Sequence, residues 1–378
     1  MFCLTFPIFS AILTLEGYYM PGPCPQGGHG PQQRGGKHLK PDAKMIKEAA
    51  RRLGADCVAI GSIDRWDTAP IQMDPKQIMP RAKSVIAMGF RVFRGSLRGI
   101  EEGTYFSNYS AMGYGGITYL YMPMTVINLC KIIEDAGYEA VPYGHQSDWR
   151  GIDNAGQRRE HYSRPVAPGK PIPDIMIHLR IAAYLCGLGE IGYSKMLLTP
   201  EFGPRQRIGI IITELELEPD PIMEPGTICT RCMACVRECP GNCISPTKTV
   251  KVKLAGHDVE WGEIDIDRCS YFFTGAEKVG EGETGDYNGE KYKPNPISPF
   301  YHKPRNLYNT GQAVCGARGC TRACMISLES QGKLKNKFEN PFRTQKPWTM
   351  DWSEEGIAAD QPGEYSNPTG RPTKSDVD

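Results

Sequence analysis

The chain has 378 residues, of which 40% are hydrophobic, and its formal net charge is +1. This length predicts two domains, or one large domain with a smaller one attached, and the hydrophobic content is enough for a substantial core. The near-zero charge argues against a broad basic surface for nucleic acid or anionic lipid.

The first part of the chain is apolar and then rich in Gly, Pro and Gln. Residues 2–15 read FCLTFPIFSAILTL, which is too short to span a bilayer. No Lys or Arg precedes this stretch, so it lacks the charged start of a signal peptide. We therefore expect residues 1–41 to be a flexible leader, the chain to have no membrane span, and the protein to be cytoplasmic.

Regular elements begin at Asp42. The sequence predicts a first helix with Ile46 and Leu53 on its apolar face and Gly54 at its end. The glycine-rich GYGGIT at 113–118 has no strand before it, so it predicts a plain loop and no dinucleotide site. The other predicted elements are strands at 57–61 and 85–90, a helix at 121–136, a strand at 139–141, a helix at 177–186 and a strand at 207–217. This alternation predicts an α/β (α+β) domain over residues 42–225.

A cysteine-rich region follows Pro225. CTRCMACVRECP places Cys229, Cys232, Cys235 and Cys239 in the C-x2-C-x2-C-x3-C-P motif of bacterial ferredoxins. In that motif three thiolates bind one [4Fe–4S] cluster and the fourth binds a second cluster. The close spacing in a large chain favours metal over disulfides, and such clusters favour a reducing compartment.

The remaining ligands must lie downstream. Cys269 stands alone in IDIDRCSYF, and CGARGCTRAC supplies Cys315, Cys320 and Cys324. The cross-ligation rule assigns Cys324 to the first cluster. The same rule assigns four ligands to the second cluster: Cys239, Cys269, Cys315 and Cys320. Since this second motif has C-x4-C-x3-C spacing and no proline, a three-ligand or absent second cluster stays open.

These assignments predict a ferredoxin-like domain at residues 226–330 with two [4Fe–4S] clusters. Cys243, four residues beyond the first motif, is interpreted as a small buried thiol. The tail at residues 331–378 is rich in Pro, Asn, Ser, Asp and Gly, which predicts an extended arm or disorder.

The order of several segments resembles the reductive dehalogenase family and the related epoxyqueuosine reductases over residues 42–327. The segments are LGADCVAIGSID, RAKSVIAMGF, EDAGYEAVPYGHQ, CGLGEIGYSKMLLTPEFGPRQRIGIIITEL and the two cysteine groups. The resemblance implies a corrinoid-binding-type domain, cobalamin or another corrinoid bound base-off, and a low-potential electron donor of the ferredoxin or flavodoxin type. Within the GLGEIG and PEFGPR motifs, it implies cofactor-binding residues: Gly187, Gly189, Glu190, Phe202 and Gly203.

The resemblance also implies catalytic roles. Tyr119, in TYLYM, matches a tyrosine that donates a proton to the carbon losing its leaving group. A tyrosine with a pKa near 10 is a weak acid and needs a nearby cation. Arg205 is the first candidate for that cation, followed by Arg207 and Lys195. The alternative is that Tyr119 packs in the core and Arg205 caps a loop.

His145 stands where dehalogenases often have asparagine, and a histidine there could donate to substrate or corrinoid. We expect an enzyme that reductively cleaves a carbon–halogen or similar bond of a small electrophilic molecule. One alternative is a tRNA-modifying epoxyqueuosine reductase, which would require Asp174. A second alternative is a ferredoxin-type electron carrier without corrinoid.

Overall fold

The computed structural model describes residues 40–105, 108–145, 164–173, 175–274, 276–278, 286–287, 290–294 and 315–348. They belong to one compact unit, Leu39–Asp378. The predicted leader before Lys40, Asp174 and residues 349–378 lie outside the described residues.

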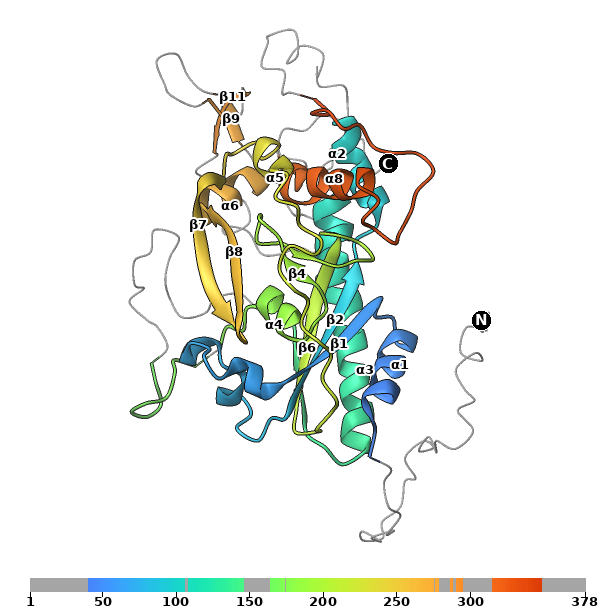
Figure 1. Cartoon of the computed structure of the whole chain (residues 1–378), viewed down its shortest axis with the longest axis vertical. Helices are drawn as coiled ribbons and strands as arrows, with labels where there is room; N and C mark the ends of the chain where they lie inside the picture. The colour runs from blue at the N-terminus through green and yellow to red at the C-terminus, as the bar shows by residue number, and fades with distance from the viewer. Residues whose placement is uncertain are drawn as a thin grey trace, which may run out of the picture. The chain divides into compact units, whose positions relative to one another are not determined.

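A four-stranded sheet with the order β1-β2-β6-β3 forms the centre of this unit, and all its neighbouring strands are antiparallel. Figure 1 labels β1, β2 and β6 of this sheet. Its strands are β1 (Cys57–Ser62), β2 (Ser84–Arg91), β6 (Gln206–Thr213) and β3 (Ala140–Tyr143). Ile86 pairs with Ile60 on one side and with Ile211 on the other. The sequence SVIAMGF is buried throughout because β2 is a central strand covered on both faces. The predicted strands are therefore confirmed.

Helices cover both faces of the sheet. α1 (Ala43–Arg52) and α3 (Met122–Asp135) pack on one face, and α4 (Leu179–Leu185) packs on the other (Figure 1). The Asp42 side chain caps α1 by accepting a hydrogen bond from the Met45 N–H at 2.8 Å. Gly54 follows α1 with φ +115°, a conformation that favours glycine. These three helices confirm the predicted ones.

GYGGIT does not form the predicted loop. It lies in a π-helix, η5 (Tyr109–Tyr121), which continues directly into α3. The loop prediction was wrong because tertiary contacts hold the glycines in the helix: a Cβ on Gly113 would lie 3.1 Å from Val92 and 3.2 Å from Ser96. In the described part of the chain, Tyr109–Asp135 is the one helix apolar and long enough to cross a membrane. Core helices with one buried face pass the same test.

The remaining elements are short, apart from one hairpin. Four 3₁₀ turns are η1 (Ile63–Trp66), η2 (Ile71–Met73), η3 (Pro75–Gln77) and η4 (Arg94–Leu97). The other helices are α2 (Arg98–Glu102), α5 (Ala234–Arg237), α6 (Ile266–Thr274), the π-helix η6 (Arg318–Ala323) and α8 (Cys324–Ser330). The other strands are β4 (Glu190–Ile191), β5 (Leu197–Leu198), β7 (Ile244–Leu254), β8 (His257–Ile264), β9 (Ala276–Lys278), β10 (Asp286–Tyr287) and β11 (Glu290–Pro294).

The cysteine-rich region shares its core with the α/β region. Val259 and Trp261, from the β7–β8 hairpin, pack in the same cluster as Tyr184 of α4. Met325 of α8 packs in the same cluster as Phe90 of β2. The described residues on the two sides of the predicted boundary are therefore parts of one folded body, and a separate ferredoxin-like domain remains a prediction.

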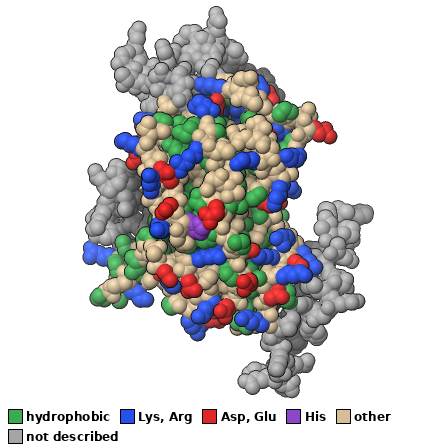
Figure 2. Space-filling model, in the orientation of Figure 1, with side chains coloured by type: hydrophobic (Ala, Val, Ile, Leu, Met, Phe, Trp, Pro, Cys, Tyr) green, Lys and Arg blue, Asp and Glu red, His purple; other side chains and the backbone are tan. Residues whose placement is uncertain are grey.

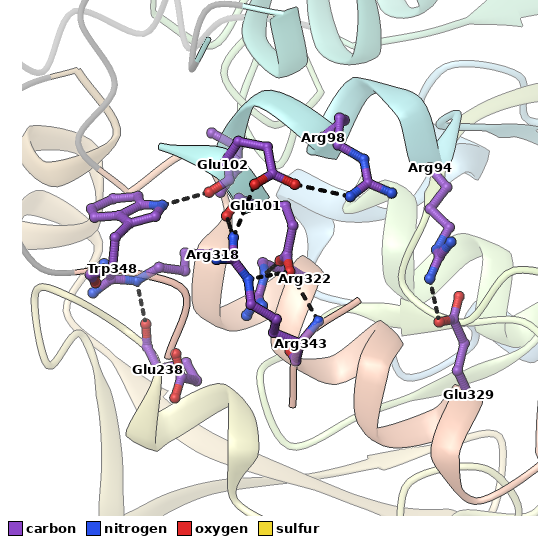
Figure 3. Close-up of polar contacts among 11 residues, drawn as sticks. Arg94, Arg98, Glu101, Glu102, Glu238, Arg318, Arg322, Glu329, Arg343 and Trp348 are labelled. Carbon is purple, nitrogen blue, oxygen red and sulfur yellow. Dashed lines mark hydrogen bonds and ion pairs between the residues drawn. The ribbon is translucent and has the colours of Figure 1, made fainter. Parts of the chain in front are cut away.

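A buried ion pair joins α2 to the second cysteine segment. The Arg322 Nε donates to a Glu101 carboxylate oxygen at 2.5 Å, and both side chains are at most 2% exposed. Arg343 donates to the other oxygen through its backbone N–H and its Nε, each at 2.9 Å (Figure 3). Trp348 donates to the Ile100 carbonyl at 2.6 Å. Residues 331–348 therefore pack on the fold, although their composition predicted an arm or disorder.

The surface carries both signs of charge. Figure 2 shows basic and acidic side chains interspersed over the face it presents. This mixture agrees with the net charge of +1.

Candidate functional site

The first four predicted ligands lie together. Cys232 Sγ is 3.1 Å from the hydroxyl of Ser327, one turn beyond Cys324 on α8. Burial raises the pKa of Cys324 well above its ordinary value, and the neighbouring Cys235, Cys229 and Cys232 raise it further. This set is the one that cross-ligation predicts for the first cluster.

The second four predicted ligands also lie near one another. Burial raises the pKa of Cys320 to about 12, and the nearby Cys269 and Cys239 raise it further. Burial likewise raises the pKa of Cys315, with contributions from Cys269 and Cys320. Cys243 donates its backbone N–H to Cys239 Sγ at 3.4 Å. Its buried thiol also hydrogen-bonds to Cys239 and Cys269, so it is part of this group as well as a core residue.

The two groups of thiols suit iron–sulfur clusters. Negative thiolates held this close repel one another, and a positively charged iron core removes that repulsion. Among the described residues, no three His, Cys, Asp or Glu side chains are grouped to hold a single metal ion. A [4Fe–4S] cluster does not need its ligands this close together, because each thiolate binds a different iron atom.

A glycine brings the two cysteine segments together. A Cβ on Gly319 would lie 2.7 Å from the backbone N of Cys239 and 2.8 Å from the carbonyl O of Cys235. Only a residue without a side chain allows η6 to approach the first segment this closely. Gly316 and Ala317 have φ of +48° and +59°, so the longer C-x4-C loop turns sharply before Cys320.

The GLGEIG motif supports the first group of thiols. Glu190 is fully buried in β4 and accepts a hydrogen bond from the Cys229 N–H. Tyr193 donates its backbone N–H to Cys229 Sγ at 3.4 Å. A Cβ on Gly189 would collide with the Leu198 carbonyl, so this glycine permits the tight β4–β5 hairpin. The hairpin thus positions Cys229.

The other three predicted cofactor-binding residues make packing contacts in the structure. Gly187 has φ +87° and approaches the Pro221 backbone closely. Gly203 has φ +60° and forms a backbone bridge with Thr199. Phe202 is buried, with the Arg91 guanidinium 6.0 Å from its ring centroid. Corrinoid contacts of these residues remain predictions.

Two tyrosines and a histidine form a hydrogen-bonded triangle. The Tyr119 hydroxyl lies 3.2 Å from His145 Nδ1, and the Tyr114 hydroxyl lies 3.1 Å from His145 Nε2. The two hydroxyls are 3.3 Å apart. In a π-helix, residues five apart lie one above the other, whereas in an α-helix they are about 1.4 turns apart. The π-helix η5 therefore turns both phenols toward His145.

Arg207, and not Arg205, is the cation beside the phenols. The Arg207 guanidinium lies 4.2 Å from the Tyr114 ring centroid, and its Nε donates to the Thr118 hydroxyl at 2.9 Å. Arg205 is 1% exposed and donates to the Val92 carbonyl at 2.7 Å and to the Asn336 side chain at 2.8 Å. Burial lowers the pKa of Arg205 to about 10. In the described part of the chain, these hydrogen bonds hold the loop before β6 against Val92 and Asn336.

The phenols lie close to the second group of thiols. The Tyr114 ring centroid is 6.2 Å from that of Phe273, which lies one turn after Cys269 on α6. Burial raises the pKa of the neighbouring Tyr109 to about 12, and Cys320 is among the thiols that raise it further. Proton donors, a cation and the second thiol group therefore share one region. Sequence reasoning missed Tyr114, because its five-residue spacing from Tyr119 is informative only once the helix is known to be a π-helix.

No protein-family model matches the chain. Over 286 residues it is 39% identical to tetrachloroethene reductive dehalogenase of Dehalobacter restrictus, an alignment that covers 61% of this chain and 45% of the relative. The chain is similar in sequence to reductive dehalogenases over the aligned part. The enzyme of the same name from Sulfurospirillum multivorans is 26% identical over 53% of this chain and 40% of its own length. An epoxyqueuosine reductase of Synechococcus sp. is 37% identical over 21% of this chain and 25% of its own length.

These relatives are oxidoreductases. The chain spans less than half the length of each of them. Two solved structures are similar to part of the chain. A reductive dehalogenase described for B12-dependent dehalogenation has a TM-score of 0.42 at 21% identity, covering 64% of this chain and 31% of that one. Epoxyqueuosine reductase of Bacillus subtilis has a TM-score of 0.39 at 16% identity, covering 80% and 68%.

Proposed function

We propose that the chain is a corrinoid-dependent iron–sulfur oxidoreductase of the reductive dehalogenase type. It would reductively cleave a carbon–halogen or similar electrophilic bond of a small molecule, with electrons delivered through two [4Fe–4S] clusters. The observation that supports this function best is the hydrogen-bonded triangle of Tyr114, Tyr119 and His145, beside Arg207 and the second group of thiols.

Eight cysteines would hold the two clusters. The first set is Cys229, Cys232, Cys235 and Cys324, and the second is Cys239, Cys269, Cys315 and Cys320. The clusters supply one-electron carriers and the corrinoid supplies a strong reductant when bound. A low-potential donor of the ferredoxin or flavodoxin type would provide the electrons.

The chain's own residues would supply the proton. The overall reaction takes two electrons and one proton, breaks the carbon–halogen bond, forms a carbon–hydrogen bond and releases halide. Tyr119 would donate the proton from its hydroxyl, and His145, 3.2 Å away, would return one to the phenolate. Arg207 would favour the phenolate electrostatically through the coupled hydroxyl of Tyr114.

Anaerobic reconstitution tests this function. The protein is incubated with iron, sulfide and hydroxocobalamin, desalted, and analysed for metals and by absorption spectroscopy. We expect about eight irons and about one cobalt per chain, the stoichiometry of one corrinoid. Iron without cobalt would contradict the proposal and favour the electron carrier.

The variants Tyr119→Phe and Asp174→Ala then separate the two enzyme families. Loss of dehalogenation in Tyr119→Phe alone supports the dehalogenase type. A requirement for Asp174 with an epoxide-bearing tRNA substrate would instead support the epoxyqueuosine reductase type.

A further inference from the structure

The exposed thiol of the first group has a serine hydroxyl against it. Cys232 is exposed, and its Sγ lies 3.1 Å from the hydroxyl oxygen of Ser327, a residue of α8. At this distance either group could donate the proton. A cysteine binds iron as the thiolate, which has no proton, so in the loaded protein the hydroxyl is the donor.

Gln331 gives this hydrogen bond the same direction independently of the iron. Its Nε2 lies 2.9 Å from the Ser327 carbonyl oxygen and 2.9 Å from the Ser327 hydroxyl oxygen. A carbonyl oxygen only accepts, so the side-chain atom that faces it is the amide nitrogen and not the amide oxygen. The same nitrogen donates to the hydroxyl oxygen. The single hydroxyl proton of Ser327 is therefore left to point at Cys232.

Thr230, from the cysteine segment itself, completes this chain of hydrogen bonds. Its hydroxyl donates to Gln331 Oε1 at 3.3 Å, which agrees with the amide orientation that the carbonyl requires. The donors then run in one direction, from Thr230 through Gln331 and Ser327 to Cys232 Sγ. Hydrogen bonds aligned in this way polarise one another, so the last of them is strengthened.

The second group of thiols has a longer contact of the same kind. A backbone N–H donates to one thiol in each group, at 3.4 Å in both cases. The Thr321 hydroxyl oxygen, however, is 3.8 Å from Cys320 Sγ, and a hydrogen bond of that length is weaker. Among these contacts of the described residues, the short hydroxyl contact distinguishes the first group from the second.

We propose that Ser327, oriented by Gln331, is a positioning residue that raises the reduction potential of the first cluster. This inference rests on the proposed function, which assigns a [4Fe–4S] cluster to that group of thiols. Reduction adds one electron from the donor, and therefore negative charge, to the cluster and its thiolates. The hydroxyl proton stabilises the reduced state more than the oxidised state, because a hydrogen bond to a more negative acceptor is stronger. The first cluster would therefore accept an electron from the low-potential donor more readily.

A redox titration of the reconstituted protein, followed by electron paramagnetic resonance of the reduced clusters, tests this role. Ser327→Ala removes the hydroxyl, and we expect one of the two midpoint potentials to fall while the other stays constant. The ratio of reduced to oxidised cluster at a fixed potential should change by about five- to tenfold. For a one-electron couple this is a fall of about 40–60 mV.

Three variants serve as controls. Ser330→Ala removes a nearby hydroxyl that donates to the Ser327 carbonyl at 2.9 Å, and it should leave both potentials unchanged. Ser327→Thr keeps a hydroxyl and should retain most of the wild-type potential. Gln331→Met removes the amide that orients the serine proton, which can then turn to a carbonyl of its own helix, so the potential should fall by part of the amount seen in Ser327→Ala.

The cluster that responds is identified by a double variant. Cys269→Ser should leave only the first cluster, and Ser327→Ala in that background should lower its potential by the same amount. No shift in that background would assign the serine to the second cluster and overturn the inference.

The iron content, the cobalt content and the midpoint of unfolding are measured for every variant, so that the outcomes separate this inference from the proposed function. Unchanged potentials in a Ser327→Ala protein that holds cobalt and both clusters would overturn the inference and leave the proposed function standing. A fall in one potential in a protein that takes up no cobalt would support the inference and contradict the corrinoid function.

Three other outcomes would also overturn the role of Ser327. Loss of about four irons in Ser327→Ala would mean that the serine serves assembly of the cluster and not its potential. An equal fall in Ser330→Ala would mean that any change in α8 has this effect. A protein that takes up no iron at all would contradict both the inference and the proposed function.

Discussion

The ion pair between Glu101 and Arg322 gives the sharpest test of how the cysteine segment is held. Glu101→Gln keeps the shape of the side chain and removes its charge, which leaves the guanidinium of Arg322, 1% exposed, without a counter-charge. Removing one partner of a buried ion pair costs about 3–5 kcal/mol. We expect the free energy of unfolding to fall by about that amount at pH 7, as measured by anaerobic guanidinium unfolding followed by tryptophan fluorescence.

The neighbouring glutamate is the matched control. Glu102 is 48% exposed and pairs with Arg98, which is 50% exposed. An exposed pair contributes about 0–1 kcal/mol, so Glu102→Gln should have a small effect. Similar losses for the two variants would refute the reasoning that burial decides the cost.

The effect of Glu101→Gln should depend on pH. Burial alone would raise the pKa of Glu101, but the hydrogen bonds from Arg322 and Arg343 outweigh it and lower the pKa below its ordinary value. A lowered pKa contributes stability that is present above the unfolded value of about 4.3 and is lost as pH falls through the folded value. The difference between wild type and Glu101→Gln should be constant above about pH 5 and shrink in more acid solution. A difference that stays unchanged as the pH falls through the folded pKa would contradict this linkage.

Four further variants can be measured on the reconstituted protein. Cys269→Ser should lose about four irons per chain by metal analysis, and an unchanged iron content would contradict its assignment to the second cluster. Gly319→Ala should lower iron incorporation, because the added Cβ would lie 2.7 Å from the backbone of Cys239; full incorporation would show that η6 can move away. Arg207→Gln should lower turnover by about tenfold or more with normal iron content and midpoint of unfolding. Arg205→Gln should instead lower the midpoint, since it loses buried hydrogen bonds, and the reverse pattern would restore Arg205 as the catalytic cation.

The sequence was informative where the signal is local. The cap at Asp42, the stop at Gly54 and the apolar run of β2 each depend on neighbouring residues, so α1 and the central strand were predicted well. The π-helix could not be predicted, because packing against Val92 and Ser96, far from the glycines in sequence, keeps GYGGIT helical. The long β7–β8 hairpin was also not predicted from the sequence.

The candidate site was predicted in part, for similar reasons. Cysteine spacing identified thiols that have other thiols as neighbours, and their assignment to two clusters stays a prediction. The sequence could not decide whether Arg205 or Arg207 is the cation beside the phenols. The two arginines are two residues apart near the start of β6, and only their tertiary contacts distinguish their roles.

The core shared by the cysteine segments and the sheet has a consequence for electron transfer. Met325 and Phe90 belong to one core cluster, and Trp261 and Tyr184 belong to another, so both clusters join the two regions in the described part of the chain. An electron passing from the second thiol group to the phenol region would cross a close-packed interior of low compressibility. No swinging or docking motion would precede the step. Its rate should therefore be insensitive to solvent viscosity, whereas delivery from an external donor, which requires diffusion, should slow as glycerol is added.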